Sequence, residues 1–231
     1  MDFKSALNHC EILNGIKYSI PHNEQDYQQC ADFYFTHFLP REPMVLALGG
    51  QGHSQDSRVR AHFLGIVRKN ASIMATDLAT GQLLGTRIAE IKEREREVQA
   101  EPSFKMFQAM YPEPIATIFY TFAKYLKDWD SFDEFKDLDR IYAMFALATH
   151  LDWGGKGIAK ELLAQSIKVA KNLGCRGAQV VATNDATIHI FQKLGMTLLQ
   201  QVPWDEIQVN GKKPLIKVNS EALCNFFLKF A

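Results

Sequence analysis

Residues 140–173 constrain the fold more than any other stretch of the chain. They read RIYAMFALATH, then LDWGGKG, then IAKELLAQSIKVAKNL. The first segment is a nearly continuous apolar run, which is typical of a strand that is covered on both faces. The last segment places Ile158, Leu162, Ile167 and Leu173 on one broad helical stripe. The order of strand, glycine turn and helix therefore predicts a buried strand beside a helix that packs on the sheet.

The rest of the chain alternates between strand and helix patterns. GIKYSIP predicts a strand that Pro21 ends, and Asn23 can cap a helix that runs toward Pro40. A turn at ATGQ predicts a hairpin within 71–93. Further helices are expected around 58–69, over 115–129 and after Asn184 or Asp185, and further strands near 177–184, 197–203 and 221–230. The charged run EREREVQAEP is either a solvated strand end or a mobile lid.

This element order predicts one domain over residues 1–231. A hairpin comes early and a strand-helix-strand-helix unit comes late, with no internal repeat and no linker. Such an order favours an α/β fold built on a mixed sheet.

Charge and cysteine usage exclude several classes of function. The 26 acidic side chains balance the 26 basic ones, which argues against a nucleic-acid partner. The four cysteines form no Cys-x-x-Cys or Cys/His cluster, so we expect free thiols and no metal. We find no charged-then-apolar leader and no apolar run of about 18 residues. We therefore expect a cytoplasmic protein with no membrane partner.

The glycine turn is a candidate anion site. A helix N-terminus presents unpaired N–H groups, its dipole favours negative charge, and glycine lets a ligand approach the backbone. Lys156 can add a phosphate contact. Two familiar phosphate motifs fail, because Gly157 follows Lys156 where a P-loop needs Ser or Thr, and Lys160 stands where the dinucleotide fingerprint needs a small residue. A plain helix-start turn remains the alternative.

The glycine turn and two further segments carry a family resemblance. GGKGIA fits Gln/Arg-x-x-Gly-x-Gly/Ala except at Gly154, and NDATIHIFQKLGM resembles the Asn-x-x-small-x-x-x-aromatic-x-Lys-x-Gly-Phe segment of the GNAT acyltransferase superfamily. YFTHFLPREPM resembles the Glu-Pro corner of invertebrate arylalkylamine (dopamine-type) N-acetyltransferases. The resemblance covers roughly residues 16–230. It implies a mostly antiparallel mixed sheet flanked by helices, with the fourth and fifth strands splayed apart.

The resemblance also implies a co-substrate, acetyl-CoA, and the residues that hold it. Its pantetheine arm would lie between the splayed strands, and its pyrophosphate would lie on the glycine turn. The residues implied for the arm are Leu147, Ala148, Thr149 and Asn184, and those implied for the pyrophosphate are Gly155, Lys156, Gly157, Ile158 and Ala159.

The expected chemistry is acetyl transfer to a primary amine, which must first lose a proton. The Glu of the Glu-Pro corner is the base that the resemblance implies, and here it is Glu42. A Glu has an ordinary pKa of about 4.3, so it needs burial or a water relay to act near neutral pH. The alternative is a loop carboxylate that caps a helix or pairs with Arg41.

Several positions depart from the family pattern. Ala148 and Leu151 stand where hydroxyl residues are expected, and Phe191 stands where many GNAT enzymes have a Tyr that protonates the leaving thiolate. Tyr142 and Tyr120 are possible substitutes. His150 suits a role in stabilising the turn, and His37 and Phe38, which flank the corner, can line an acceptor pocket.

The sequence thus favours an acetyl-CoA-dependent N-acetyltransferase that acts on a small arylalkylamine. A polyamine, an amino acid or a protein lysine are alternative acceptors, and a non-catalytic acyl-CoA-binding protein is the alternative from another class. The sequence does not determine which amine or acyl chain is used, or the route of the proton. It is also compatible with either a monomer or a homodimer.

Overall fold

The computed structural model describes residues 9–94, 102–126 and 131–230, and its framework is one mixed sheet. The strand order is β1-β2-β3-β4-β5-β6-β8-β7. Neighbouring strands are antiparallel except β5 and β6, which are parallel. The strands are β1 (Cys10–Leu13), β2 (Ile16–Ser19), β3 (Ile73–Asp77), β4 (Leu83–Glu93), β5 (Arg140–Thr149), β6 (Gly177–Ala182), β7 (Thr197–Pro203) and β8 (Ala222–Lys229).

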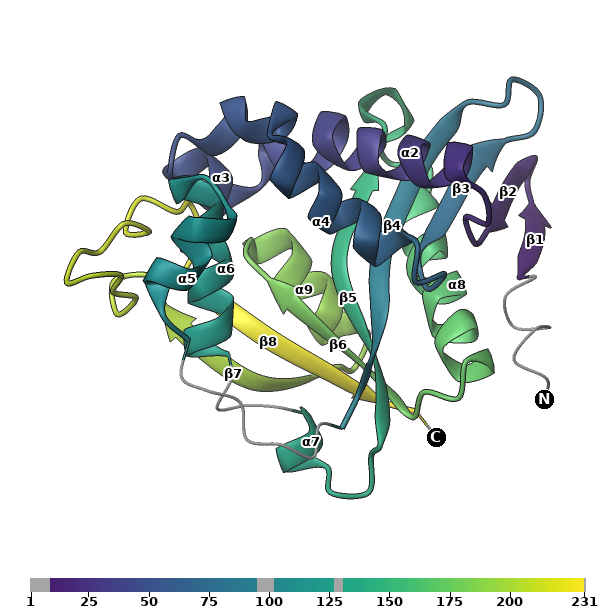
Figure 1. Ribbon diagram of the computed structural model, residues 1–231. Helices are drawn as coiled ribbons and strands as arrows, with labels where there is room; N and C mark the ends of the chain where they lie inside the picture. The colour runs from purple at the N-terminus through teal and green to yellow at the C-terminus, as the bar shows by residue number, and fades with distance from the viewer. Residues whose placement is uncertain (1–8, 95–101, 127–130, 231) are drawn as a thin grey trace.

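Helices cover both faces of this sheet (Figure 1). They are α2 (Glu24–Phe33), α3 (Pro43–Ala47), α4 (Ser57–Val67), α5 (Phe104–Met110), α6 (Glu113–Tyr125), α7 (Ser131–Glu134), α8 (Ile158–Asn172) and α9 (Asp185–Lys193). One apolar core gathers side chains of α2, α4 and α6, and a second gathers those of α8 and α9 on the other face. The mixed, mostly antiparallel sheet between helices confirms the predicted fold class.

Gly85 has no side chain, which lets α8 pack close to β4. A Cβ there would lie 2.9 Å from Leu162 Cδ1 and 3.0 Å from the Ala148 carbonyl oxygen. Both distances are shorter than ordinary van der Waals contacts, so this glycine sets how near the start of α8 comes to the sheet.

The sheet opens between β5 and β6. These strands pair only from Tyr142 opposite Ala178 to Met144 opposite Val180, whereas β5 continues to Thr149. A register shift against β4 leaves Phe145 as the extra residue of a bulge, which bends β5 where the pairing ends. The predicted fourth and fifth strands are β5 and β6, so the predicted splay between them is confirmed. It leaves one edge of β5 without a partner strand beyond Met144.

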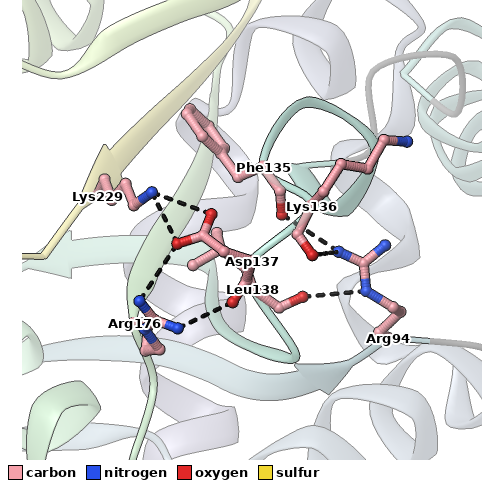
Figure 2. A network of polar contacts seen from close by, with 7 residues as sticks. All are labelled: Arg94, Phe135, Lys136, Asp137, Leu138, Arg176 and Lys229. Atoms are coloured by element: carbon pink, nitrogen blue, oxygen red, sulfur yellow. Dashed lines mark hydrogen bonds and ion pairs between the residues drawn. The ribbon is translucent and has the colours of Figure 1, made fainter.

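A polar network holds the other end of the same strands together (Figure 2). The carboxylate of Asp137, in the loop before β5, accepts hydrogen bonds from Lys229 Nζ at 2.9 and 3.0 Å and from Arg176 at 3.2 Å. Arg94 donates to three carbonyl oxygens of the same loop, those of Phe135, Lys136 and Leu138. We call this network the Asp137 clamp, and it ties the loop to β8, to the residue before β6 and to the chain after β4.

Some details differ from the sequence expectations, and others cannot be compared with them. The chain forms an additional strand, β1, which pairs with β2 through an Asn14-Gly15 turn with both φ angles positive. The helix that Asn23 caps leaves the α conformation after Phe33 and continues as a π-helical turn over Tyr34–Phe38. Most of EREREVQAEP, and the end of the helix expected over 115–129, lie outside the described residues.

Candidate active site

A pocket of about 220 Å³ lies where β5 and β6 part. It brings together five of the residues that the sequence implicated: Glu42, Leu147, Ala148, Thr149 and Asn184. The remaining lining residues are His37, Phe38, Arg41, Pro43 and Thr183. The Glu-Pro corner and the ends of two strands, which are far apart in the sequence, therefore share one cavity.

The edge of β5 at this pocket presents free backbone groups. His150 N donates to Leu84 O at 2.8 Å, and the register alternates, so the backbone groups of Ala148 face β4. Those of Leu147 and Thr149 face the gap. Arg41 reaches the same edge from the corner, because its Nη2 donates to Thr149 O at 3.2 Å.

A chain of short turns positions Glu42. The π-helical turn is followed by a 3₁₀ turn over Leu39–Arg41, and Glu42 then caps α3, with Pro43 in the first helical turn. Its Oε2 accepts a hydrogen bond from Val45 N at 2.7 Å, whereas its Oε1 is buried without a partner in the described part of the chain. Glu42 therefore does cap a helix, as the alternative interpretation expected. Capping uses one carboxylate oxygen and leaves the other in the pocket.

The surroundings of Glu42 shift its pKa toward neutrality. The residue is only 8% exposed, and burial raises the pKa of its carboxyl group above the ordinary value. The hydrogen bond from Val45 N, together with the nearby Thr183 side chain and Met44 backbone, lowers the pKa and so opposes part of this rise. Arg41 forms no ion pair with it and instead binds the His37 and Thr149 carbonyl oxygens. A carboxylate with a raised pKa and one unpartnered oxygen is suited to accept a proton.

The glycine turn forms a second part of the candidate site. Gly155 and Gly157 have φ angles of +74° and +79°, and α8 begins directly afterwards at Ile158 with no side-chain cap. The first N–H groups of a helix have no acceptor within the helix, so this end is free to bind an anion. Lys156 Nζ lies 4.0 Å from the centre of the Trp153 ring. Gly155, Lys156, Gly157, Ile158 and Ala159 thus lie at the start of α8 and do not line the pocket.

Asn184 is held by the helix that it begins. Its Oδ1 accepts from Thr187 N at 2.9 Å and from Thr187 Oγ1 at 2.8 Å. The side-chain oxygen is therefore committed to capping α9, which leaves the amide nitrogen as the group that Asn184 can offer to a ligand.

The histidines near the corner lie together. The His37 and His150 rings are 4.8 Å apart, and His150 Nδ1 accepts from Asp152 N at 3.3 Å in the turn after β5. This matches the turn role expected for His150. Burial, followed by the charges of His150 and Arg41, lowers the pKa of His37.

The tyrosines considered as acids lie away from the pocket. Tyr142 is fully buried and donates to Ala71 O, and burial raises its pKa. Tyr120 packs against Phe104 and Phe107. Phe191 packs against Phe226 in the core. None of these side chains lines the cavity, so none is positioned to protonate a leaving group there.

A second pocket, of about 510 Å³, adjoins the first. Arg41, Pro43 and Asn184 line both, and its other lining residues are Leu46, Ala47, Lys217 and Asn219. Sequence reasoning missed Thr183, Lys217 and Asn219. Thr183 could have been found from its place directly before Asn184, but the loop before β8 carries no pattern that reveals the pocket residues.

Part of the chain is similar to known proteins. Residues 89–196 match the model of the acetyltransferase (GNAT) family. The L-amino acid N-acyltransferase MnaT of Escherichia coli is 33% identical over 78 residues, which span 33% of this chain and 43% of that protein. Within the described ranges, no helix combines the length and apolar character needed to cross a membrane.

Solved structures share the fold over nearly the whole chain. Arylalkylamine N-acetyltransferase 2 from Aedes aegypti superposes with a TM-score of 0.81 at 21% identity, covering 94% of this chain and 100% of that one. A polyamine N-acetyltransferase of Drosophila melanogaster that forms N-acetylagmatine gives 0.76 at 15% identity, covering 93% and 100%. The fold is that of GNAT acetyltransferases. The family match covers a little under half of the chain, and the aligned segment covers 43% of the Escherichia coli protein.

Proposed function

We propose that this chain transfers an acetyl group from acetyl-CoA to the primary amine of a small molecule, with Glu42 as the base. The observation that carries this proposal is the position of Glu42 Oε1, which is buried and unpartnered at the pocket where β5 and β6 part. A proton acceptor at that place adjoins the strand edge along which a thioester would lie.

The donor would occupy the gap and the glycine turn. The backbone groups of Leu147 and the N–H group of Thr149 face the gap and are available to the pantetheine arm, whereas Thr149 O accepts from Arg41. The amide nitrogen of Asn184 is available from the opposite side. The N–H groups from Gly155 to Ala159 would bind the pyrophosphate, and Lys156 would add a charge.

The reaction needs one bond to form and one to break. The neutral amine nitrogen attacks the thioester carbonyl carbon, the C–N bond forms, and the C–S bond breaks to release the CoA thiolate. The proton that the amine gives up passes to Glu42, directly or through water. Because no tyrosine lines the cavity among the described residues, the thiolate leaves without a phenolic acid in this proposal.

The acceptor we propose first is an arylalkylamine. The Glu-Pro corner and the likeness to the Aedes aegypti enzyme support it, and Phe38 and His37 line the pocket with rings. The match to an L-amino acid N-acyltransferase keeps amino acids as the second candidate.

The test compares wild type with Glu42→Gln in the release of free thiol from acetyl-CoA across a panel of amines. The Gln side-chain oxygen can still cap α3, so the corner keeps its structure, while the base is removed. We expect turnover to fall by about 10²- to 10⁴-fold, with acetyl-CoA binding retained in calorimetry. Unchanged turnover would remove Glu42 from the mechanism. No release with any amine, despite acetyl-CoA binding, would instead indicate an acyl-CoA-binding protein.

A further inference from the structure

The second pocket carries positive charge without an acid to balance it. Its charged lining residues are Arg41 and Lys217, and no Asp or Glu lines it within the described chain. Its polar lining residues, Asn184 and Asn219, add amide groups. A cavity with this lining offers many hydrogen-bond donors and favours a negatively charged occupant.

Neither cation is neutralised by a neighbour. Arg41 donates to the backbone carbonyls of His37 and Thr149, which fix the guanidinium in place but do not cancel its charge. Lys217 is exposed, and in the part of the chain that the structure describes neither side chain has a carboxylate within ion-pair distance. Both charges are therefore available to a ligand.

The start of α9 adds to this field. Asn184 caps that helix with its Oδ1, which leaves its amide nitrogen as a donor, and the positive end of the helix dipole lies at the same place. The neighbouring acid, Asp185, is an exposed side chain that accepts from Glu221 N at 3.4 Å, and it does not line the pocket.

The two pockets form one path from Glu42 outward. Arg41, Pro43 and Asn184 line both, so a ligand with its amine beside Glu42 extends toward Arg41 and Lys217. We propose that the acceptor carries a carboxylate as well as its amine, and that Arg41 and Lys217 bind that carboxylate. This inference rests on the proposed function and narrows its acceptor. A polyamine would instead bring a second cation toward two like charges.

The test uses matched acceptors that differ by one carboxylate: tyrosine with tyramine, tryptophan with tryptamine, and arginine with agmatine. Thiol release from acetyl-CoA gives kcat/KM for each. We expect the carboxylated member to be preferred by about tenfold in at least one pair, as charge-assisted hydrogen bonds at a partly exposed site would give. If the amines without the carboxylate are equal or better in every pair, the inference is wrong, while the proposed function stands. No release with any of the six overturns both.

A substitution at Lys217 tests whether the second pocket causes the preference for carboxylated acceptors. Lys217→Gln should reduce kcat/KM for the carboxylated acceptor by about three- to fivefold, because KM rises. The kcat/KM for the amine without the carboxylate should not change. Lys213→Gln, an equal charge change on the same exposed loop outside both pockets, is the control and should change neither. An effect of Lys217→Gln on the KM for acetyl-CoA alone would mean that the cation serves the donor, and would contradict the inference.

Discussion

Glu42 combines a structural and a chemical task in one side chain. One carboxylate oxygen caps α3 through Val45 N, and the other is buried at the pocket without a partner. Capping fixes the rotamer, so the second oxygen keeps its position with little loss of side-chain entropy on binding. The sequence could identify this residue from the Glu-Pro corner, but it left the capping and base roles as alternatives. The structure allows both because the two oxygens face different groups.

The pKa of Glu42 gives a prediction for pH dependence. Burial raises this pKa, so the carboxylate that accepts the proton is lost as the pH falls through a value above the ordinary 4.3 or so. We expect kcat of the wild type, measured from about pH 4 to pH 8 with a saturating acceptor, to fall on the acid side with that inflection. The residual kcat of Glu42→Gln should lack it. An inflection at or below the ordinary value, or one that persists in the variant, would contradict the assignment.

At the scale of elements, the sequence patterns predicted β5, α8 and the turn between them because burial and helical periodicity are local signals. They failed where the backbone departs from regular geometry. Leu84 and Ile88 share one parity in the sequence, yet they pack in different cores, since the register of β3 and β4 shifts beside Leu84. The strand β1 was missed because its four residues are too few to show a strand pattern, although the Asn14-Gly15 pair is a strong hairpin signal.

The glycine turn offers a matched test of the proposed pyrophosphate site. Gly157 and Gly81 have φ angles of +79° and +72°, and a Cβ at either would meet nothing within 4 Å. Alanine at each position therefore costs a similar backbone strain, about 1 kcal/mol, without a clash.

We expect Gly157→Ala and Gly81→Ala to lower the free energy of unfolding of the unliganded protein by similar amounts in urea titrations. Only Gly157→Ala should weaken the binding of acetyl-CoA, measured by calorimetry, because the strain at this position is relieved by moving the N–H groups at the start of α8. Equal acetyl-CoA affinities for the two variants would show that the turn does not bind the donor.

Across the whole molecule, the two ends of β5 have opposite arrangements. The Asp137 clamp fixes the end at which β5 and β6 are paired (Figure 2), and the pocket lies at the other end. The residues that line the open end come from the corner before α3, from β5, from the end of β6 and from the loop before β8. Local sequence patterns do not reveal contacts between segments that are far apart in the chain, which is why Lys217 and Asn219 were not predicted. Leu147 and Thr149 were expected only because the family resemblance implied them.

The clamp predicts a pH-dependent contribution to stability. Hydrogen bonds from Lys229, and the charges of Lys229 and Arg176, lower the pKa of Asp137. Its contribution is therefore complete above the ordinary Asp pKa of about 3.9 and is lost as the pH falls through the lowered value. We expect Asp137→Asn to lower Tm at pH 7.

The difference in Tm between the two proteins should be unchanged at pH 5.5 and should narrow in 1 M salt, because the partners are exposed and salt screens them. Asp205→Asn, an exposed acid with no ion pair in the described residues, is the control and should leave Tm unchanged. A variant as stable as the wild type at pH 7 would show that the clamp adds nothing to the fold.

The open edge of β5 has a consequence for the lifetime of the protein. An unpaired strand edge in the middle of a sheet is a local weakness, and a molecule that lies along it takes the place of the missing strand. A ligand present at a hundred times its Kd would add about 2.7 kcal/mol to the stability of the folded state. If acetyl-CoA is that ligand, the supply of a metabolite would set how long each copy of the enzyme survives heat and proteases.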